Sequence, residues 1–455
     1  LIALIVLDLF AAGINYNTYV DPATVYPPTE SINFLREDDT LYRILPVGGF
    51  ATFIPNSAMV YGISSAGGFS PLCTQRYWEY VSLIDGARIT SNGALFFTKY
   101  TESKLIDLLN VKYVVALPTE DLTLKEGVVQ DLSDASVGEI WGHNTHGQTF
   151  ISHYPNLTAI SIMPATYKRV NIYNTTFHLR DSSLSEKDII TITFNNSELK
   201  DNVYYTFRFS PIADSENKRF YFYLESPESI PGNAITVWAS SADSYSEGER
   251  HVNGLPSLGD LRFRTFHKIS TDLTLVYDGE VKIYRNLDYL PRAFVVHQAK
   301  VIDDKEEILN ELRSERFDPM GYVILEENVT NEMLNGGPLS GGNSLAKVIS
   351  YSPNKVVVNA KMAGGGFLLL ADAYDSNWGV YVDGKRDRVY VANYILRAVY
   401  LNKGEHIVEF IYNPNAFRIL LYLSLSTLLI VAAVALLTIY RSSFMTSLKR
   451  VRKRD

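Results

Sequence analysis

The sequence is poor in cysteine and in clustered positive charge. Cys73 is its single cysteine, so neither an internal disulfide framework nor a zinc site built on several thiolates can form. The formal net charge is -8 at pH 7, and basic residues gather only at the C-terminal end. No nucleic-acid partner is expected, because proteins that bind nucleic acid present a basic patch or stripe.

Aromatic residues, in contrast, are plentiful. They make up 12% of the chain, with 30 tyrosines and 22 phenylalanines, while charged residues account for 20%. Many half-buried tyrosines suit sheets more than helical bundles, because the ring packs while the hydroxyl reaches a polar partner. The chain of 455 residues is therefore expected to hold about three domains and to be rich in β-structure.

Long uncharged runs are rare, and the main exception lies near the C-terminus. Ile419–Tyr440 reads ILLYLSLSTLLIVAAVALLTIY and carries no charge. At a rise of about 1.5 Å per residue it crosses a bilayer core of roughly 30 Å, whereas a buried core helix is seldom uncharged for so long. Residues 418–440 are therefore predicted to form a transmembrane helix in the lipid bilayer.

A basic cluster follows this helix. By the positive-inside rule, residues 441–455 form a cytoplasmic tail, and residues 13–417 lie on the outer side of a cell membrane. The cluster consists of Arg441, Lys449, Arg450, Arg452, Lys453 and Arg454.

The first residues, LIALIVLDLFAAG, form a second apolar run that only Asp8 interrupts. This run is too short to cross a membrane, and a signal peptide would need a basic stretch before it and a small-residue cleavage site after it. We interpret residues 1–12 as the end of a preceding transmembrane helix. On this interpretation the chain is the C-terminal part of a multi-pass membrane protein, and its partners include the upstream membrane helices of the same protein.

Residues 13–147 mix two periodicities. Strand-like runs at 41–48 and 111–117 bracket helix-like runs at 76–86 and 102–110. These patterns predict the first part of an outer α/β domain.

The second part of the same domain is expected at residues 271–335. A hairpin at 274–286, closed by Asp278-Gly279, precedes a helix-like run at 305–318 and a strand-like run at 322–327. The α/β pattern thus resumes after an insertion.

The insertion, residues 148–270, has a period of two throughout. Short alternating runs such as DIITITFN, YYTFRFSPI and RFYFYLES are separated by Asn, Asp, Ser, Pro and Gly. Such spacing is typical of a β-sandwich of the jelly-roll type.

A Gly/Ser-rich linker at 331–344 leads into a last group of strands at residues 336–417, with turns at Asp383-Gly384 and Lys403-Gly404. This group predicts a small membrane-proximal β-sandwich. The fold class is therefore mixed α/β plus all-β, with a C-terminal transmembrane helix.

The C-terminal block resembles the end of YfhO-like bacterial membrane proteins. The resemblance rests on Trp378, the V-D-G-K hairpin at 382–385, the R-A-V strand at 397–399, Gly404 with His406, and Y-x-P at 412–414. Earlier segments fit the family in the same order, namely LDLFAAGINYN (7–17), YPPTESINFL (26–35), YRILPV (42–47), PNSAMVYGISSAGGFSPL (55–72) and LLNVKYVVA (108–116). The resemblance covers roughly 1–145 and 280–440 and leaves the insertion without support.

The resemblance implies membership of the type C glycosyltransferase superfamily, whose members transfer a sugar from a polyprenyl-phosphate donor outside the membrane. YfhO-like proteins are associated with glycosylation of cell-envelope polymers. In such enzymes the catalytic acidic residue lies in the first outer loop, which this sequence does not contain. No catalytic residue can therefore be carried over, and no cofactor is expected in this portion.

Two groups in the insertion are candidate contacts to envelope components. Jelly-roll sandwiches often bind sugars through aromatic faces beside polar side chains, although the same residues can instead pack or be solvated. The candidate glycan contacts are Trp238, Tyr245, Arg250, His251 and Asn253. The candidate contacts to a phosphate or a phosphate-bearing polymer are Arg262, Arg264, His267 and Lys268, for which alternation on a half-exposed strand is an equal explanation.

Other chemistry is not favoured. Asp372 and Asp375 flank a turn near Trp378, where a carboxylate pair would suit glycoside hydrolysis, but Asp is favoured there for local hydrogen bonds. His143, His146 and His153 lie in a loop region without a Cys or carboxylate pair to complete a metal site, so no metal is expected.

Two functions remain open. The first is the extracytoplasmic portion of a polytopic membrane glycosyltransferase acting on a cell-envelope glycopolymer or glycolipid, in which this portion positions the acceptor or contacts glycan. The alternative is a membrane-anchored, non-catalytic carbohydrate-binding or structural ectodomain. An enzyme would need an upstream membrane-embedded half with an acidic outer loop, whereas a binding module would need only an anchor.

Overall fold

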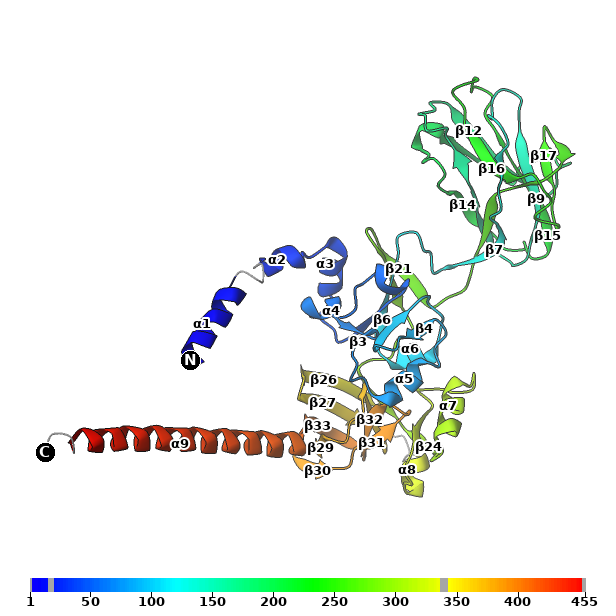
Figure 1. The fold of residues 1–455 in the computed structure, drawn as a ribbon. Helices are drawn as coiled ribbons and strands as arrows, with labels where there is room; N and C mark the ends of the chain where they lie inside the picture. Colours follow the sequence, from blue (N-terminus) through cyan, green and yellow to red (C-terminus); the bar gives the residue numbers. More distant parts are fainter. Residues whose placement is uncertain (1, 15–19, 336–342, 452–455) are drawn as a thin grey trace. The chain divides into compact units, whose positions relative to one another are not determined.

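The structure is a computed structural model that describes residues 2–14, 20–335 and 343–451 (Figure 1). The chain forms two compact units. One, here called the inserted unit, is Thr119–Thr274, and the other, the main unit, combines Leu1–Pro118 with Leu275–Asp455. Both are built mostly from strands.

The first sheet of the main unit has the order β2-β1-β6-β22-β21. β1 (Arg43–Pro46) runs parallel to β2 (Ser64–Ser65) and β6 (Val111–Ala116), and β6 is buried along its whole length, as expected of a central parallel strand. After the inserted unit, β21 (Leu273–Asp278) and β22 (Lys282–Asn286) return to this sheet, where β22 lies beside β6 and β21 forms the edge. The predicted strands at 41–48 and 111–117 and the hairpin at 274–286 are therefore present.

Short capped helices surround this sheet. The side chains of Thr29, Thr74 and Ser103 accept hydrogen bonds from backbone N–H groups in the first turns of α3, α5 and α6. Such caps satisfy amides that a helix leaves without partners. The helices are α3 (Glu30–Arg36), α4 (Ser57–Val60), α5 (Gln75–Val81) and α6 (Lys104–Leu108), with the 3-10 turn η1 (Gly49–Ala51) and the small sheet β3 (Gly68–Phe69), β5 (Ala94–Phe97) and β4 (Ala87–Ile89).

Two further sheets of the main unit form the C-terminal sandwich. The first has the order β23-β28-β32-β31-β25-β24 and the second the order β26-β27-β33-β29-β30. Their facing side chains, among them Leu368, Val399, Val408 and Phe410, share one core. The strands are β23 (Ala293–Val296), β24 (Gln298–Val301), β25 (Tyr322–Leu325), β26 (Leu345–Ser352), β27 (Lys355–Met362), β28 (Gly366–Ala373), β29 (Trp378–Val382), β30 (Lys385–Asp387), β31 (Tyr390–Ala392), β32 (Leu396–Leu401) and β33 (Gly404–Tyr412).

The strands that form this sandwich do not follow the expected division into domains. Strands β23, β24 and β25, expected in the α/β domain with residues 271–335, pair with strands of the C-terminal sheet instead. The reason is long-range pairing, because β23 lies antiparallel to β28 over four residue pairs and covers an otherwise open sheet edge. The predicted helix at 305–318 is α7 (Lys305–Arg313), and α8 (Asn331–Asn335) precedes the expected linker, of which 336–342 lie outside the described residues.

The inserted unit is a second sandwich. One sheet has the order β14-β10-β20-β7 and the facing sheet the order β13-β12-β15-β9-β17-β18, with a smaller sheet β11-β16-β19 and β8 at its side. Phe177 of β12 stacks on Phe207 of β14 with 4.1 Å between ring centroids, so the core joins the two large sheets. The strands are β7 (Leu124–Gln130), β8 (Ala135–Ser136), β9 (His146–Ser152), β10 (Leu157–Ile162), β11 (Pro164–Ala165), β12 (Asn174–Arg180), β13 (Ile190–Asn195), β14 (Tyr205–Ile212), β15 (Lys218–Glu225), β16 (Thr236–Ser240), β17 (Arg250–Val252), β18 (Leu255–Ser257), β19 (Asp260–Leu261) and β20 (Phe263–Lys268), with the 3-10 turn η2 (Asn196–Glu198).

This unit begins earlier than the expected boundary at residue 148. β7 pairs with β20 and β8 pairs with β16, so the segment from Thr119 onward belongs to the sandwich and not to the α/β domain. The pairing partners lie more than a hundred residues further along the chain, which is why local periodicity does not reveal them. The jelly-roll connectivity itself stays a prediction.

The C-terminal helix α9 (Asn415–Val451) contains the predicted transmembrane segment. Its residues Asn415–Arg441 are long and apolar enough to cross a membrane, and their side chains are not buried by the rest of the chain. The N-terminal helix α1 (Ile2–Gly13) is apolar but shorter, and α2 (Pro22–Val25) is a single turn. One helix among the described residues thus meets the criteria for a membrane span, at the predicted place.

A pair of glycines tests the packing of the inserted unit. Gly259 and Gly254 have similar backbone angles, φ 84° and 78°, but a Cβ at Gly259 would lie 2.0 Å from the carbonyl oxygen of Ser240, whereas one at Gly254 meets nothing within 4 Å. We expect Gly254→Ala to lower the free energy of unfolding by about 1 kcal/mol through backbone strain, and Gly259→Ala by about 3 kcal/mol because the clash adds to it. Chemical unfolding monitored by fluorescence measures both, and equal losses would contradict the packing described.

Candidate functional site

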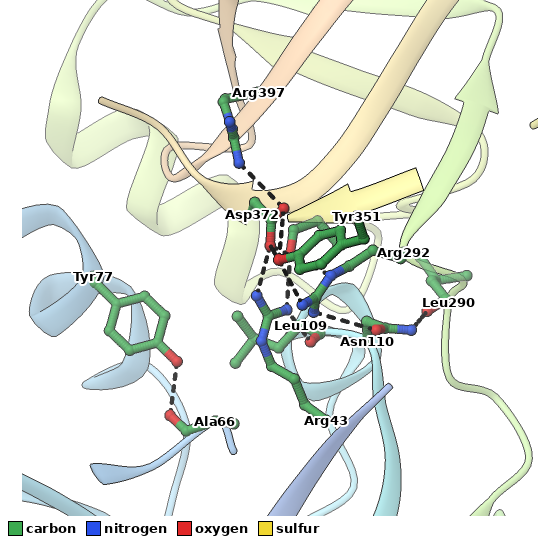
Figure 2. A network of polar contacts seen from close by, with 11 residues as sticks. Arg43, Ala66, Tyr77, Leu109, Asn110, Leu290, Arg292, Tyr351, Asp372 and Arg397 are labelled. Atoms are coloured by element: carbon green, nitrogen blue, oxygen red, sulfur yellow. Dashed lines mark hydrogen bonds and ion pairs between the residues drawn. The ribbon is translucent and has the colours of Figure 1, made fainter. Parts of the chain in front are cut away.

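One buried carboxylate in the main unit contacts three arginines (Figure 2). The Asp372 oxygens lie 3.0 Å from Arg43 Nη2, 3.4 Å from Arg292 Nε and 3.1 Å from Arg397 Nη2. The side chains of Asp372, Arg292 and Arg397 are almost completely shielded from solvent. We call these four residues the arginine cluster.

The fold brings the four residues together from separate segments. Asp372 lies near the end of β28, where the pairing with β32 shifts register between Leu370 and Ala373, and such an irregularity re-aims a side chain. Arg397 comes from β32, and Arg292 immediately precedes β23. Arg43 starts β1 of the first sheet, so the cluster connects that sheet to the C-terminal sandwich.

Further hydrogen bonds hold the guanidinium groups. Arg43 Nη1 donates to the carbonyl oxygens of Leu109 and Ala371, at 2.7 and 2.8 Å. Arg292 Nη2 donates to the Tyr351 hydroxyl at 3.0 Å, and that hydroxyl donates to Asp372 (Figure 2). These contacts fix the position of each charge.

The positive and negative charges of the arginine cluster are unequal in number. Burial alone would raise the pKa of Asp372, but Arg292, Arg43 and Arg397 hold it below its ordinary value, so the carboxylate stays ionised. Burial lowers the pKa of Arg397 to about 10, and it also lowers the pKa of Arg43, which Arg292 depresses further. Three guanidinium groups face one carboxylate, so positive charge is in excess.

Part of this excess positive charge lies against aromatic rings. The guanidinium carbon of Arg397 lies 3.8 Å from the centre of the Trp378 ring and 5.7 Å from that of Phe410. A ring face attracts a cation and takes the place of a second carboxylate there. Trp378 also packs against the core of the sandwich.

A cavity of about 460 Å³ adjoins the cluster, and Arg43 forms part of its wall. This volume lies within the range of about 300–1,000 Å³ that is typical of ligand pockets. The Tyr77 hydroxyl donates to the Ala66 carbonyl at 2.7 Å (Figure 2). Tyr77 also lines the cavity. Other wall residues are Leu109, Ala371, Ala373, Ile395, Leu396 and the segment from Ser65 to Thr74.

Part of the rim of this cavity is apolar. Leu72, with an exposed fraction of 91%, and Met59, with 72%, both line the opening. Cys73 also lies on the wall, and burial raises the pKa of its thiol, which makes it a poor nucleophile. The cavity can hold an amphipathic molecule with an anionic group near Arg43. The described residues of its wall include no Asp, Glu or His, so they offer no acid–base pair for hydrolysis.

The predicted glycan contacts do not form one site. Trp238 lies on β16 and lines a cleft on the surface of the inserted unit. Tyr245 packs into the core edge-to-face with Phe263, and His251 is buried beside Tyr221. The Arg250 guanidinium donates to the Ser257 hydroxyl, and Asn253 Oδ1 accepts from the backbone N–H of Thr145.

The four residues predicted to contact phosphate also do not form one site. Arg262 and Arg264 share one surface, where Arg264 pairs with Asp131 and both guanidinium groups approach the Tyr204 ring. His267 lies on the opposite, buried face of β20, and burial lowers its pKa. Lys268 is exposed at the strand end. The structure thus brings Trp238 next to Arg262, whose N–H donates to the Trp238 carbonyl at 2.8 Å, and separates the other predicted residues.

The histidines considered as metal ligands lie apart. His146 is buried on β9, and His153 pairs with Glu247. Within the described ranges, no cluster of His, Cys, Asp or Glu side chains is arranged to hold a metal ion.

Local reasoning about Asp372 was wrong. We expected it to make short-range hydrogen bonds, and it instead pairs with arginines as far away in sequence as Arg43. Asp375 does make the local contact, since its Oδ1 accepts from the Asn377 N–H at 2.9 Å. A usable signal was present, because Arg43, Arg292 and Arg397 each stand alone among apolar strand residues, and a buried charge requires a partner.

We expect Asp372→Asn to lower the free energy of unfolding by about 3–5 kcal/mol, because it leaves three guanidinium groups without their carboxylate. Asp375→Asn is the matched control, since its side-chain oxygen still accepts from Asn377, and it should change stability by less than about 0.5 kcal/mol. Denaturant unfolding of the full chain in detergent measures both.

The same pair of variants predicts a pH dependence. Because the pKa of Asp372 is lowered in the folded state, its stabilisation is present above the ordinary carboxyl pKa and lost as the pH falls through the lowered value. The stability difference between the wild type and Asp372→Asn should therefore be constant above about pH 4 and shrink below it. A difference that persists at lower pH would show that Asp372 does not act as a charge.

The comparison with protein families concerns the C-terminal sandwich. Residues 342–424 match the family described as bacterial membrane protein YfhO. The match begins just before β26, includes β33 and ends within α9. No curated protein matches the chain.

Some solved structures are similar at low identity. Two structures of the arabinofuranosyltransferase AftD from Mycobacteria, the first of them a mutant, align with 71% and 66% of this chain at 10% and 8% identity, with TM-scores of 0.19 and 0.16. This chain covers only 28% and 25% of theirs. A Pleurotus ostreatus lectin aligns with 64% of this chain and 77% of its own, at 10% identity and a TM-score of 0.14.

These structural scores are too low to support an argument about fold or function. The family match, in contrast, confirms the resemblance carried by Trp378, the V-D-G-K hairpin and the R-A-V strand, all of which lie inside it. Residues 342–424 of this chain are therefore similar to the bacterial membrane proteins of the YfhO family.

Proposed function

We propose that this chain is the extracytoplasmic portion of a polytopic membrane glycosyltransferase. The enzyme would transfer a sugar from a polyprenyl-phosphate donor to a cell-envelope glycopolymer or glycolipid. The observation that carries the proposal is the YfhO family match, which extends from the C-terminal sandwich into the transmembrane helix. This portion would be accessory, with catalysis in a membrane-embedded part outside this sequence.

The connection between sandwich and membrane supports an accessory role. β33 ends at Tyr412 and α9 begins at Asn415. The Asn413 N–H donates to the Asn377 carbonyl at 2.8 Å, so the helix start is tied to the sandwich. A rigid domain held this close to the bilayer surface suits the handling of acceptors near lipid-linked sugars.

The cavity beside the arginine cluster supports the same role. Its partly apolar rim and the excess of positive charge behind Arg43 suit an acceptor or lipid that combines an anionic group with an apolar part. In the proposal this cavity positions the acceptor. No cofactor is assigned to this portion.

The alternative function is a membrane-anchored, non-catalytic ectodomain that binds carbohydrate or has a structural role. The arginine cluster is compatible with this alternative as well, because its carboxylate is paired and not available for acid–base chemistry. The jelly-roll-like connectivity proposed for the inserted unit is compatible with either function.

Sugar transfer by the full-length protein distinguishes the two functions. Membranes that contain it should transfer radiolabelled sugar from a polyprenyl-phosphate donor to the envelope glycan fraction. Replacing residues 119–274 by a short Gly/Ser linker should preserve membrane insertion, because β6 and β22 are neighbours in one sheet, but reduce transfer to polymeric acceptor. No labelled product from the intact protein would contradict the glycosyltransferase and favour the alternative.

The proposed orientation has its own test. In a Cys73→Ser background, Glu186→Cys on an exposed segment of the inserted unit should react with a membrane-impermeant maleimide on intact cells. Ser447→Cys, placed after the transmembrane segment, should react only after permeabilisation, because the positive-inside rule assigns the basic tail to the cytoplasm. The reverse pattern would overturn the orientation.

A further inference from the structure

A cleft of about 310 Å³ opens on the inserted unit between β16 and the loops that follow β11 and precede β14. Its wall is formed by Trp238, Tyr167, Lys168, Asp201 and Asn202, with smaller residues between them. We propose that this cleft binds a neutral sugar unit of a glycan. The inference deepens the proposed function and rests on it only for the assumption that the glycan is an envelope acceptor.

Hydrogen bonds hold the indole of Trp238 in one position. Its Nε1–H donates to Asn202 Oδ1 at 2.6 Å, and Asn202 Nδ2 donates to Asp201 Oδ2 at 3.0 Å. Asp201 Oδ1 in turn accepts from the backbone N–H of Thr166 at 2.7 Å. The ring is therefore oriented by a chain of contacts that ends on the backbone, while the side chain stays partly exposed at the cleft.

Tyr167 is held at the cleft by an unusual backbone. Tyr167 and Lys168 both have φ 56°, a conformation that large residues rarely adopt. Such strained residues persist where the surrounding structure requires them, and they concentrate at ligand-binding sites. Tyr167, with an exposed fraction of 44%, lines the cleft together with Trp238, and the guanidinium carbon of Arg169 lies 4.7 Å from the centre of its ring.

The chemistry of the cleft matches a sugar. Aromatic faces accept the apolar C–H face of a sugar ring, and nearby charged and amide groups bond its hydroxyls. Hydrogen bonds from the Thr166 backbone and side chain lower the pKa of Asp201, so its carboxylate is an acceptor at neutral pH. Lys168 supplies donors, and Asn202 holds both the Trp238 ring and the carboxylate in place.

Charge balance favours a neutral ligand over an anionic one. Lys168 is offset by Asp201 within the cleft. The neighbouring Arg264 is paired with Asp131 at 2.6 Å and with Glu126 at 3.1 Å, and Arg262 lies near enough to Asp131 to lower its pKa, so these two arginines face two carboxylates and leave no excess positive charge. An anionic polymer would need such an excess.

The adjoining surface can extend the site to further sugar units. The backbone N–H of Arg262 donates to the Trp238 carbonyl at 2.8 Å, and the Arg262 Nε donates to the Tyr204 hydroxyl at 3.1 Å. The Tyr204 ring, flanked by Arg262 and Arg264, is a third aromatic group on this face. A chain of sugars is therefore a better fit than an isolated monosaccharide.

Binding of neutral trisaccharides tests the proposal. The full chain, kept in a zwitterionic detergent without a sugar headgroup, is titrated calorimetrically with cellotriose, maltotriose, mannotriose and chitotriose. We expect at least one to bind, and both Trp238→Ala and Tyr167→Asn to weaken that binding by about tenfold or more, the effect of losing one aromatic contact.

The choice of variants separates binding from folding. Asn adopts positive φ readily, so Tyr167→Asn removes the ring without adding backbone strain and should not lower stability. Trp141→Ala is the matched control, since Trp141 is an exposed tryptophan of the same unit that does not line the cleft, and it should leave binding unchanged.

Each contrary outcome has a definite meaning. If none of the trisaccharides binds, if only anionic glycans bind, or if Trp141→Ala weakens binding as much as Trp238→Ala, the cleft assignment is overturned. Sugar binding by this chain without transfer by the full-length protein contradicts the proposed glycosyltransferase and leaves the cleft assignment standing.

Discussion

The carboxylate of Asp372 is the interaction on which the main unit depends. Burying one charge costs several kcal/mol, and burying four is tolerated only where geometry and further hydrogen bonds compensate. Here they do, because Arg43 also bonds two backbone carbonyls and Arg397 lies over Trp378. Since Arg43 belongs to the first sheet and Asp372 to the C-terminal sandwich, the position of the cavity between them depends on this one ion-pair network.

Features that depend on neighbours in the chain could be predicted from the sequence. The transmembrane segment follows from an uncharged run, and the Asp383-Gly384 turn follows from two residues that accept positive φ, with angles of 51° and 77°. Domain boundaries could not, because β7 joins the inserted unit through β20 and β23 joins the C-terminal sandwich through β28. The residues of a short strand do not indicate which distant sheet edge the strand will pair with.

The candidate sites show the same division between local and distant information. Arg262, just before β20, and Arg264 within it alternate with Phe263, Thr265 and His267, and the second set is buried. Strict attention to this period of two would have separated His267 from the arginines. The pairing of Arg43 with Asp372, 329 residues apart, had only an indirect signal in the isolated arginines of apolar strands.

The two candidate binding surfaces differ in a way that follows from their electrostatics. The cavity beside Arg43 adjoins a cluster in which three guanidinium groups face one carboxylate, and its rim is partly apolar, whereas the Trp238 cleft has balanced charges and aromatic walls. An anionic amphiphile gains from the first and a neutral sugar chain from the second, and neither ligand would exchange sites without losing its main contact. In the proposed function the cavity takes the anionic, apolar part of an acceptor and the cleft takes neutral sugar units, so the different character of the two surfaces supports two separate binding roles.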